Sequence, residues 1–162
     1  MPVRRSAVLA LLACLILVLG ACSGGGRTAT VTHAAVTATI IDAGDPGPSV
    51  GDVRFFEIAA ALEGSAAPAR LDATLTTTGE NVPNAGDEVR IGHLVFSFGA
   101  GTDQVVVDGT SVYPGAGSTI QVNSSTIRPI VGGSGAYAGA RGWAESFHLA
   151  DGTWRHVLHL LP

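Results

Sequence analysis

The chain has 162 residues, of which 14% are charged, and a formal net charge of −4. It contains no lysine, so it lacks the basic stripe that nucleic-acid binding or attachment to anionic lipid requires. The length allows one hydrophobic core, and we therefore expect a single folded domain.

The first 21 residues are typical of a lipoprotein signal peptide. Arg4 and Arg5 precede an apolar run at positions 7–19, which has the length of a secretory signal and is short for a transmembrane helix. The run leads into a Leu-Gly-Ala-Cys tetrapeptide ending at Cys22, which resembles the lipobox of bacterial lipoproteins. The alternative is an ordinary signal peptide in which this cysteine is incidental.

Lipid modification of Cys22 predicts a protein held at the outer face of the cytoplasmic membrane, within the cell envelope, by its lipid anchor alone. Residues 22–29 are rich in glycine and predict a flexible tether. Removal of the signal leaves seven Arg against thirteen Asp and Glu, a net charge of about −6. The other cysteine, Cys14, is lost with the signal, so no disulfide is expected.

The remainder, residues 30–162, predicts an all-β domain. β-Branched runs with a period of two alternate with clusters of Gly, Pro, Asn and Asp. They predict eight strands, over 30–42, 52–62, 71–78, 89–98, 104–112, 119–131, 140–149 and 153–161. The alanine-rich stretch at 59–62 also fits a helical turn. Strands at this spacing predict a closed antiparallel barrel or a sandwich, with no helix longer than about three turns.

Three apparent motifs do not carry chemistry. Residues 47–51 match Gly-x-Ser-x-Gly around Ser49, but a nucleophile elbow needs a strand before it and a helix after it. The glycine-rich stretch 133–139 lacks the βαβ unit of a phosphate-binding loop. His156 and His159, three apart on a predicted strand, point to opposite faces. We therefore expect no metal site and no cofactor.

The segment from Arg128 to Ala144 carries the most informative pattern. Residues 130–142 read Ile-Val-Gly-Gly-Ser-Gly-Ala-Tyr-Ala-Gly-Ala-Arg-Gly, which resembles the signature shared by plant allene oxide cyclases and dirigent proteins. Residues 42–52 resemble the loop after the first strand in bacterial relatives of those cyclases, and residues 93–99 stand where the family has an aromatic strand. The resemblance implies an eight-stranded antiparallel barrel with an apolar cavity, a small hydrophobic ligand and a homotrimer.

The resemblance also implies site residues. Allene oxide cyclases use a glutamate on the first strand, whereas residues 37–42 here read Thr-Ala-Thr-Ile-Ile-Asp, which argues against that reaction itself. Dirigent proteins hold a phenolic intermediate with carboxylates and the arginine of an Ala-Arg-Gly motif. The corresponding residues are Arg141 and, by position, Asp42. A salt bridge at a strand end and a turn-initiating aspartate are the alternatives for these two residues.

The strand after the glycine segment has one bulky and one small face. Because bulk favours the lumen of a barrel, Trp143, Glu145 and Phe147 are expected to point inward. Glu145 is then a candidate general acid whose pKa an apolar wall would raise. Trp143 and Phe147, with Phe96 and Phe98, are predicted to contact a ligand.

Two functions stay open at this stage. One is a barrel that binds a small apolar molecule, with or without catalysing a cyclisation or isomerisation by confining it. The other is a non-enzymatic structural or interaction lipoprotein with a filled lumen. A cavity that reaches Asp42, Arg141 or Glu145 favours the first function, and a lumen packed shut favours the second.

Overall fold

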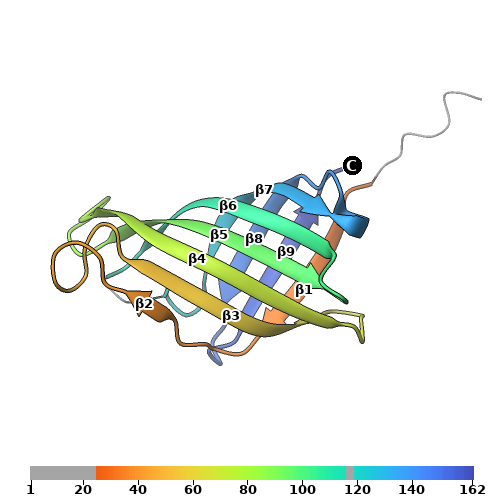
Figure 1. Ribbon diagram of the computed structural model, residues 1–162, viewed down its shortest axis with the longest axis horizontal. Coiled ribbons are helices and arrows are strands. Elements are labelled where there is room, and N and C mark those ends of the chain that lie inside the picture. The colour runs from red at the N-terminus through yellow and green to blue at the C-terminus, as the bar shows by residue number, and fades with distance from the viewer. Residues whose placement is uncertain (1–24, 116–118) are drawn as a thin grey trace, which may run out of the picture.

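The computed structural model describes residues 25–115 and 119–162. The predicted signal peptide and the lipid-attachment residue Cys22 lie outside these described residues. One antiparallel sheet and a short 3-10 helix make up the fold (Figure 1). The elements are β1 (Arg27–His33), β2 (Thr39–Ile41), β3 (Val53–Leu62), β4 (Pro68–Glu80), β5 (Glu88–Phe98), β6 (Asp103–Tyr113), β7 (Ser124–Ser134), η1 (Gly135–Tyr137), β8 (Gly142–His148) and β9 (Trp154–Leu160).

The sheet closes into a barrel. Its strands follow the order β1-β9-β8-β7-β6-β5-β4-β3-β2, and β1 also pairs with β3 through Val31 opposite Leu62 and Thr32 opposite Ala61. These pairs complete an eight-stranded antiparallel barrel, with β2 lying beside β3 (Figure 1). The predicted fold class is confirmed, and the sandwich alternative is wrong.

The N-terminal part of the barrel differs from the prediction in two ways. The strand expected over 30–42 is interrupted, because residues 34–38 leave the ladder between β1 and β2. The barrel also begins at Arg27, inside the expected tether, because Thr28 and Ala29 continue the pairing with β9. The stretch 59–62 is strand throughout and pairs with β4 and β1, so its helical alternative is wrong.

The lumen has a packed half and a polar half. Along β5 the inward positions are polar at the start, Glu88 and Arg90, and apolar at the end, Phe96 and Phe98. The apolar half forms the main core of the barrel. Its buried residues are Val31, Ile58, Ala69, Leu71, Leu94, Phe96, Phe98, Val105, Val107, Ile130, Ala144, Leu158 and Leu160. The polar half holds the candidate site.

A bulge and a tight corner shape β7 and the segment after it. The pairing with β6 shifts between Val106 and Val107, and beyond this bulge Arg128 and Ile130 face inward. At the corner, a Cβ on Gly133 would lie 2.6 Å from the backbone oxygen of Gln104, so only glycine fits there. Within the described residues, η1 is the one helical element, and no helix is long and apolar enough to cross a membrane.

Candidate functional site

An open cavity of about 250 Å³ occupies the part of the lumen next to β2. Three residues of the 34–38 segment, Val36, Thr37 and Ala38, line it, and Phe56, Leu75 and Leu94 contribute to its apolar wall. The polar side chains that line it are His33, Thr37, Arg54, Arg90, Tyr113, Thr119, Thr126, Arg128, Ser146 and His156. Side chains therefore do not fill this half of the barrel, which argues against the alternative of a closed lumen.

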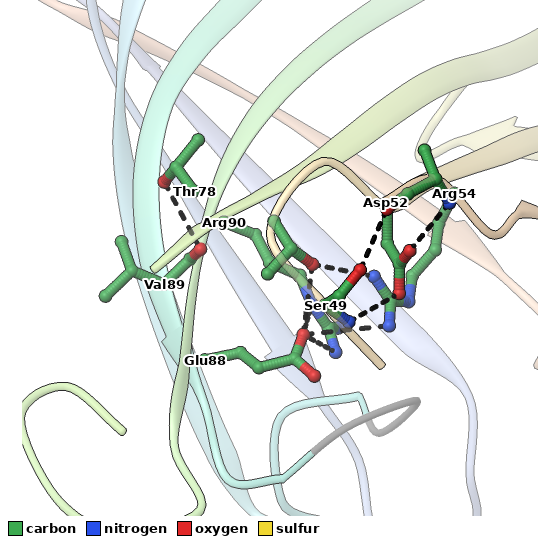
Figure 2. A network of polar contacts seen from close by, with 9 residues as sticks. Ser49, Asp52, Arg54, Thr78, Glu88, Val89 and Arg90 are labelled. Carbon is green, nitrogen blue, oxygen red and sulfur yellow. Dashed lines mark hydrogen bonds and ion pairs between the residues drawn. The ribbon is translucent and has the colours of Figure 1, made fainter. Parts of the chain in front are cut away.

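Three buried arginines line the cavity, and none of the described lining residues is Asp or Glu. Arg90 Nε and Nη2 lie 2.9 and 2.8 Å from Oε2 of Glu88, and Arg54 Nη2 lies 3.6 Å from the same oxygen (Figure 2). Thr77 Oγ1 accepts a hydrogen bond from Arg54 and donates one to this oxygen. One carboxylate oxygen thus pairs with two guanidinium groups. The third buried arginine, Arg128, does not take part in this network.

The buried carboxylate of Asp52 is committed to the loop before β3. It accepts hydrogen bonds from the backbone N–H groups of Ala43 and Ser49, each at 3.1 Å (Figure 2). These two bonds are the main reason that the pKa of Asp52 is lowered, and the charge of Arg54 lowers it further. The hydroxyl of Ser49 donates to the carbonyl of Ala43 at 2.8 Å. Asp52 and Ser49 therefore hold the loop that borders the site.

Arg128 has neutral partners only. Its Nη2 donates to the hydroxyl of Tyr113 at 2.9 Å, and its Nη1 donates to Oγ1 of Thr126 at 3.1 Å. Within the described residues, its buried Nε has no hydrogen-bond partner and no carboxylate lies within ion-pair distance of its guanidinium. Because a buried charge without an opposite charge is unfavourable, this guanidinium would be stabilised by an anionic group in the cavity.

A hydrogen-bonded chain crosses β8, β9 and β1 in the wall of the cavity. The oxygen of Ser146 lies 2.8 Å from Nδ1 of His156, and Nε2 of His156 lies 3.0 Å from Nε2 of His33. Nδ1 of His33 lies 2.6 Å from the carbonyl oxygen of Ala34. A carbonyl oxygen only accepts, so His33 donates from Nδ1 and, when neutral, accepts at Nε2. The direction of the chain follows: Ser146 donates to His156, which donates to His33.

Both histidines are held neutral. Burial lowers the pKa of His156 to about 3, and the neighbouring His33 and Arg128 contribute to the same effect. Burial also lowers the pKa of His33, against the opposing effect of its bond to Ala34. At neutral pH the two rings therefore serve as hydrogen-bond donors and acceptors, and the arginines supply the positive charge of the cavity.

β8 presents the opposite face to that predicted. Ala144 points inward and is 2% exposed, whereas Trp143 is 39% exposed on the outer surface. Trp143 stacks on His159 at 4.6 Å, and Phe147 lies 4.7 Å from the guanidinium of Arg155. The prediction that the bulky face of β8 points into the lumen is therefore wrong for Trp143 and Phe147. The opposite orientations predicted for His159 and the buried His156 are confirmed.

The three predicted catalytic residues lie outside the cavity and apart from one another. The carboxylate of Asp42 accepts a hydrogen bond from the backbone N–H of Gly47 at 3.2 Å, within the loop that follows β2. Arg141 donates to the carbonyl of the terminal Pro162. Glu145 accepts a hydrogen bond from Ser125 at 3.1 Å on the outer side of β8. The geometry thus gives none of them a place at the cavity.

The two phenylalanines of β5 point inward, as predicted, but do not line the cavity. Phe96 is fully buried and meets the ring of His156 edge-on at 5.1 Å. Phe98 packs against Tyr137 at 5.1 Å in the apolar half. Both belong to the core of the apolar half and are not among the residues that line the cavity.

The buried arginines are not among the site residues predicted from the sequence, although their spacing carries a signal. Arg54 stands two and four residues before Phe56 and Ile58 on one strand, and Arg128 stands two residues before Ile130. A period of two places each arginine on the same face as these apolar residues. The signal was passed over because arginine is rarely buried.

The comparisons with known proteins bear on the fold. No family model matches the chain, and no curated protein matches it. Among solved structures, the chain is similar to one named pyocyanin demethylase, with a TM-score of 0.62 and 19% sequence identity. The match covers 83% of this chain and 99% of that chain. At this level of identity the likeness shows a shared barrel fold.

Proposed function

We propose that the protein is an exported barrel that binds one small, largely apolar molecule in the cavity beside β2. The cavity itself carries the proposal, since it is open and side chains leave about 250 Å³ of it unfilled. This volume is slightly below the roughly 300–1,000 Å³ of common small-molecule sites, and eight-stranded barrels hold one small ligand. The similarity to pyocyanin demethylase supports it, because that protein's name describes an enzyme.

The proposal includes membership of the allene oxide cyclase/dirigent-like barrels. Its support is the order of the three matching segments, 42–52, 93–99 and 130–142, within a closed antiparallel barrel. It also includes the homotrimer typical of that family. The exposed apolar residues Ile127 and Val131 lie on β7 next to Trp143 on β8, and together they offer an apolar surface for a second copy.

A fluorescence titration tests whether the cavity binds a ligand. Trp154 lines the cavity, and Trp143→Phe leaves it as the sole tryptophan of the chain. In that variant, 2-naphthalenemethanol should change the Trp154 emission saturably. Adding Ala73→Phe places a large side chain in the cavity and should weaken binding of the probe by about tenfold or more. A loss of this order is expected when the probe can no longer bury part of its apolar surface.

The matched control is Ala59→Phe, because Ala59 is exposed on the outer face of β3. It should leave the affinity of the probe unchanged. Binding that Ala73→Phe and Ala59→Phe affect equally would place the probe elsewhere and reject the cavity as the site.

Proton-transfer catalysis, of the isomerase or cyclase type, is a second candidate. The directional chain from Ser146 through His156 to His33 favours it, because a proton taken from a bound molecule at Ser146 can pass through His156 to Nε2 of His33, whose ring then holds it as an imidazolium. Confinement against the apolar wall of the cavity would fix one conformer of the substrate. The candidate requires a neutral His156 near pH 7, which the pH dependence of stability measures directly.

For localisation, we expect Cys22→Ala to abolish lipid attachment. The unmodified protein should then move from the membrane fraction to the aqueous fraction, because the lipid is its proposed anchor. Fractionation and the intact mass of wild type and variant provide the measurement. An unchanged mass with continued membrane partitioning would contradict the lipobox interpretation.

A further inference from the structure

The charges inside the polar half of the barrel do not balance. Arg54 and Arg90 share Glu88, and the other buried acid, Asp52, is bound by backbone N–H groups of its own loop. Arg128 uses two of its five N–H donors, both on neutral oxygens. The described part of the lumen therefore holds an excess of positive charge centred on Arg128.

The space around this guanidinium is built by two glycines. Gly92 on β5 and Gly109 on β6 lie opposite each other in the ladder. A Cβ on Gly92 would lie 2.8 Å from Leu75 and 3.2 Å from Nε of Arg128, and one on Gly109 would lie 3.1 Å from Pro129. A larger residue at position 92 would crowd Nε of Arg128, and one at position 109 would crowd the proline that follows the arginine, so the two glycines leave room for the buried Arg128 at the cavity wall.

A guanidinium buried without an opposite charge lowers stability unless a ligand supplies that charge. A carboxylate matches it best, because its two oxygens can accept parallel hydrogen bonds from the planar arginine fork. The hydroxyls of Tyr113 and Thr126 already hold the orientation of the fork. Phe56 and Leu75 provide apolar surface for the rest of the molecule.

We infer that the occupant of the cavity is a small organic acid with an apolar body, whose carboxylate pairs with Arg128. This inference rests on the proposed function and adds the chemical class of the ligand. It assigns Arg128 as the binding residue for the carboxylate, with Tyr113 and Thr126 as positioning residues.

A pair of probes with the same ring system tests the inference. In the Trp143→Phe protein, 2-naphthoate should bind at least about tenfold more tightly than 2-naphthalenemethanol, which is the order of one charge-assisted hydrogen bond. This comparison needs no substitution at the site, so it decides the matter even if Arg128 variants fail to fold. Equal affinities would overturn the inference and leave the proposed function intact, whereas absence of binding by both probes would reject the proposed function.

Two arginine variants locate the carboxylate. Arg128→Gln should weaken naphthoate by about 10- to 100-fold, the value of a charge-assisted pair, and change the alcohol by less than about threefold. The control Arg70→Gln, on an exposed arginine paired with Asp72, should change neither affinity. Arg128→Lys keeps the charge but not the planar fork of the guanidinium. Its affinity for naphthoate should lie between those of the wild-type residue and Arg128→Gln. Naphthoate binding that is insensitive to Arg128→Gln would overturn the assignment.

Discussion

Replacing Glu88 by Gln should lower the free energy of unfolding by about 3–5 kcal/mol, the usual cost of removing one partner of a buried ion pair. Glu88 supplies the carboxylate oxygen that Arg54 and Arg90 share, and all three side chains are at least 95% buried. The substitution keeps the shape of the side chain and removes its charge. Urea unfolding followed by circular dichroism measures the loss.

Glu57→Gln is the matched control. Glu57 also pairs with an arginine, Arg70 at 3.4 Å, but its side chain is 78% exposed. Exposed ion pairs contribute between zero and about 1 kcal/mol, so this variant should unfold almost as wild type does. Similar small losses in both variants would show that the charges in the lumen are screened by water, contrary to the burial of Glu88.

The pH dependence of stability should carry the signature of His156. Its pKa is about 3 in the folded barrel, lowered by burial, by His33 and by Arg128, against about 6.5 in the unfolded chain. Unfolding therefore takes up a proton below pH 6.5. This group should reduce stability by about 3 kcal/mol between pH 6.5 and pH 4 and should have no effect above that range.

His156→Gln isolates this contribution, since every other titrating group is common to the two proteins. The difference in unfolding free energy between wild type and variant should shrink steadily as the pH falls from 6.5 to 4. The comparison uses only the slope of the unfolding free energy against pH, so a loss of stability at pH 7 caused by the substitution does not affect the result. His159→Gln, which removes a histidine from the outer face of the same strand, is the matched control for the loss of a histidine as such. A slope for His156→Gln equal to that of wild type would contradict a neutral, buried His156.

The strands could be predicted from the sequence because alternation and turn residues are local signals. β5 was expected over 89–98 and is observed over Glu88–Phe98, and β3 was expected over 52–62 and is observed over Val53–Leu62. Closure could not be derived in this way. The ring is closed by two residue pairs between β1 and β3, Val31 with Leu62 and Thr32 with Ala61. These strands are not consecutive in the chain, and no local pattern in the sequence marks the residues that pair.

The faces of the strands were harder to predict than their positions. Alternation on β8 separated Trp143 from Ala144 correctly but did not say which of them points inward. Packing between strands decides the orientation, since Ala144 lies in the core with Phe96 of β5 and with Leu158, its ladder partner on β9. The site was missed for a related reason, because its three arginines, Arg54, Arg90 and Arg128, come from three different strands.

The interruption between β1 and β2 has a kinetic consequence. A barrel with a continuous ladder on every side would have to break several hydrogen bonds to exchange a molecule held in its lumen. Here residues 34–38 belong to no strand, and Val36, Thr37 and Ala38 line the cavity, while the closing pairs at Val31 and Thr32 lie farther along β3. Displacing this segment would break no strand pair, so we expect loading and release to pass through it while the ring of paired strands stays closed.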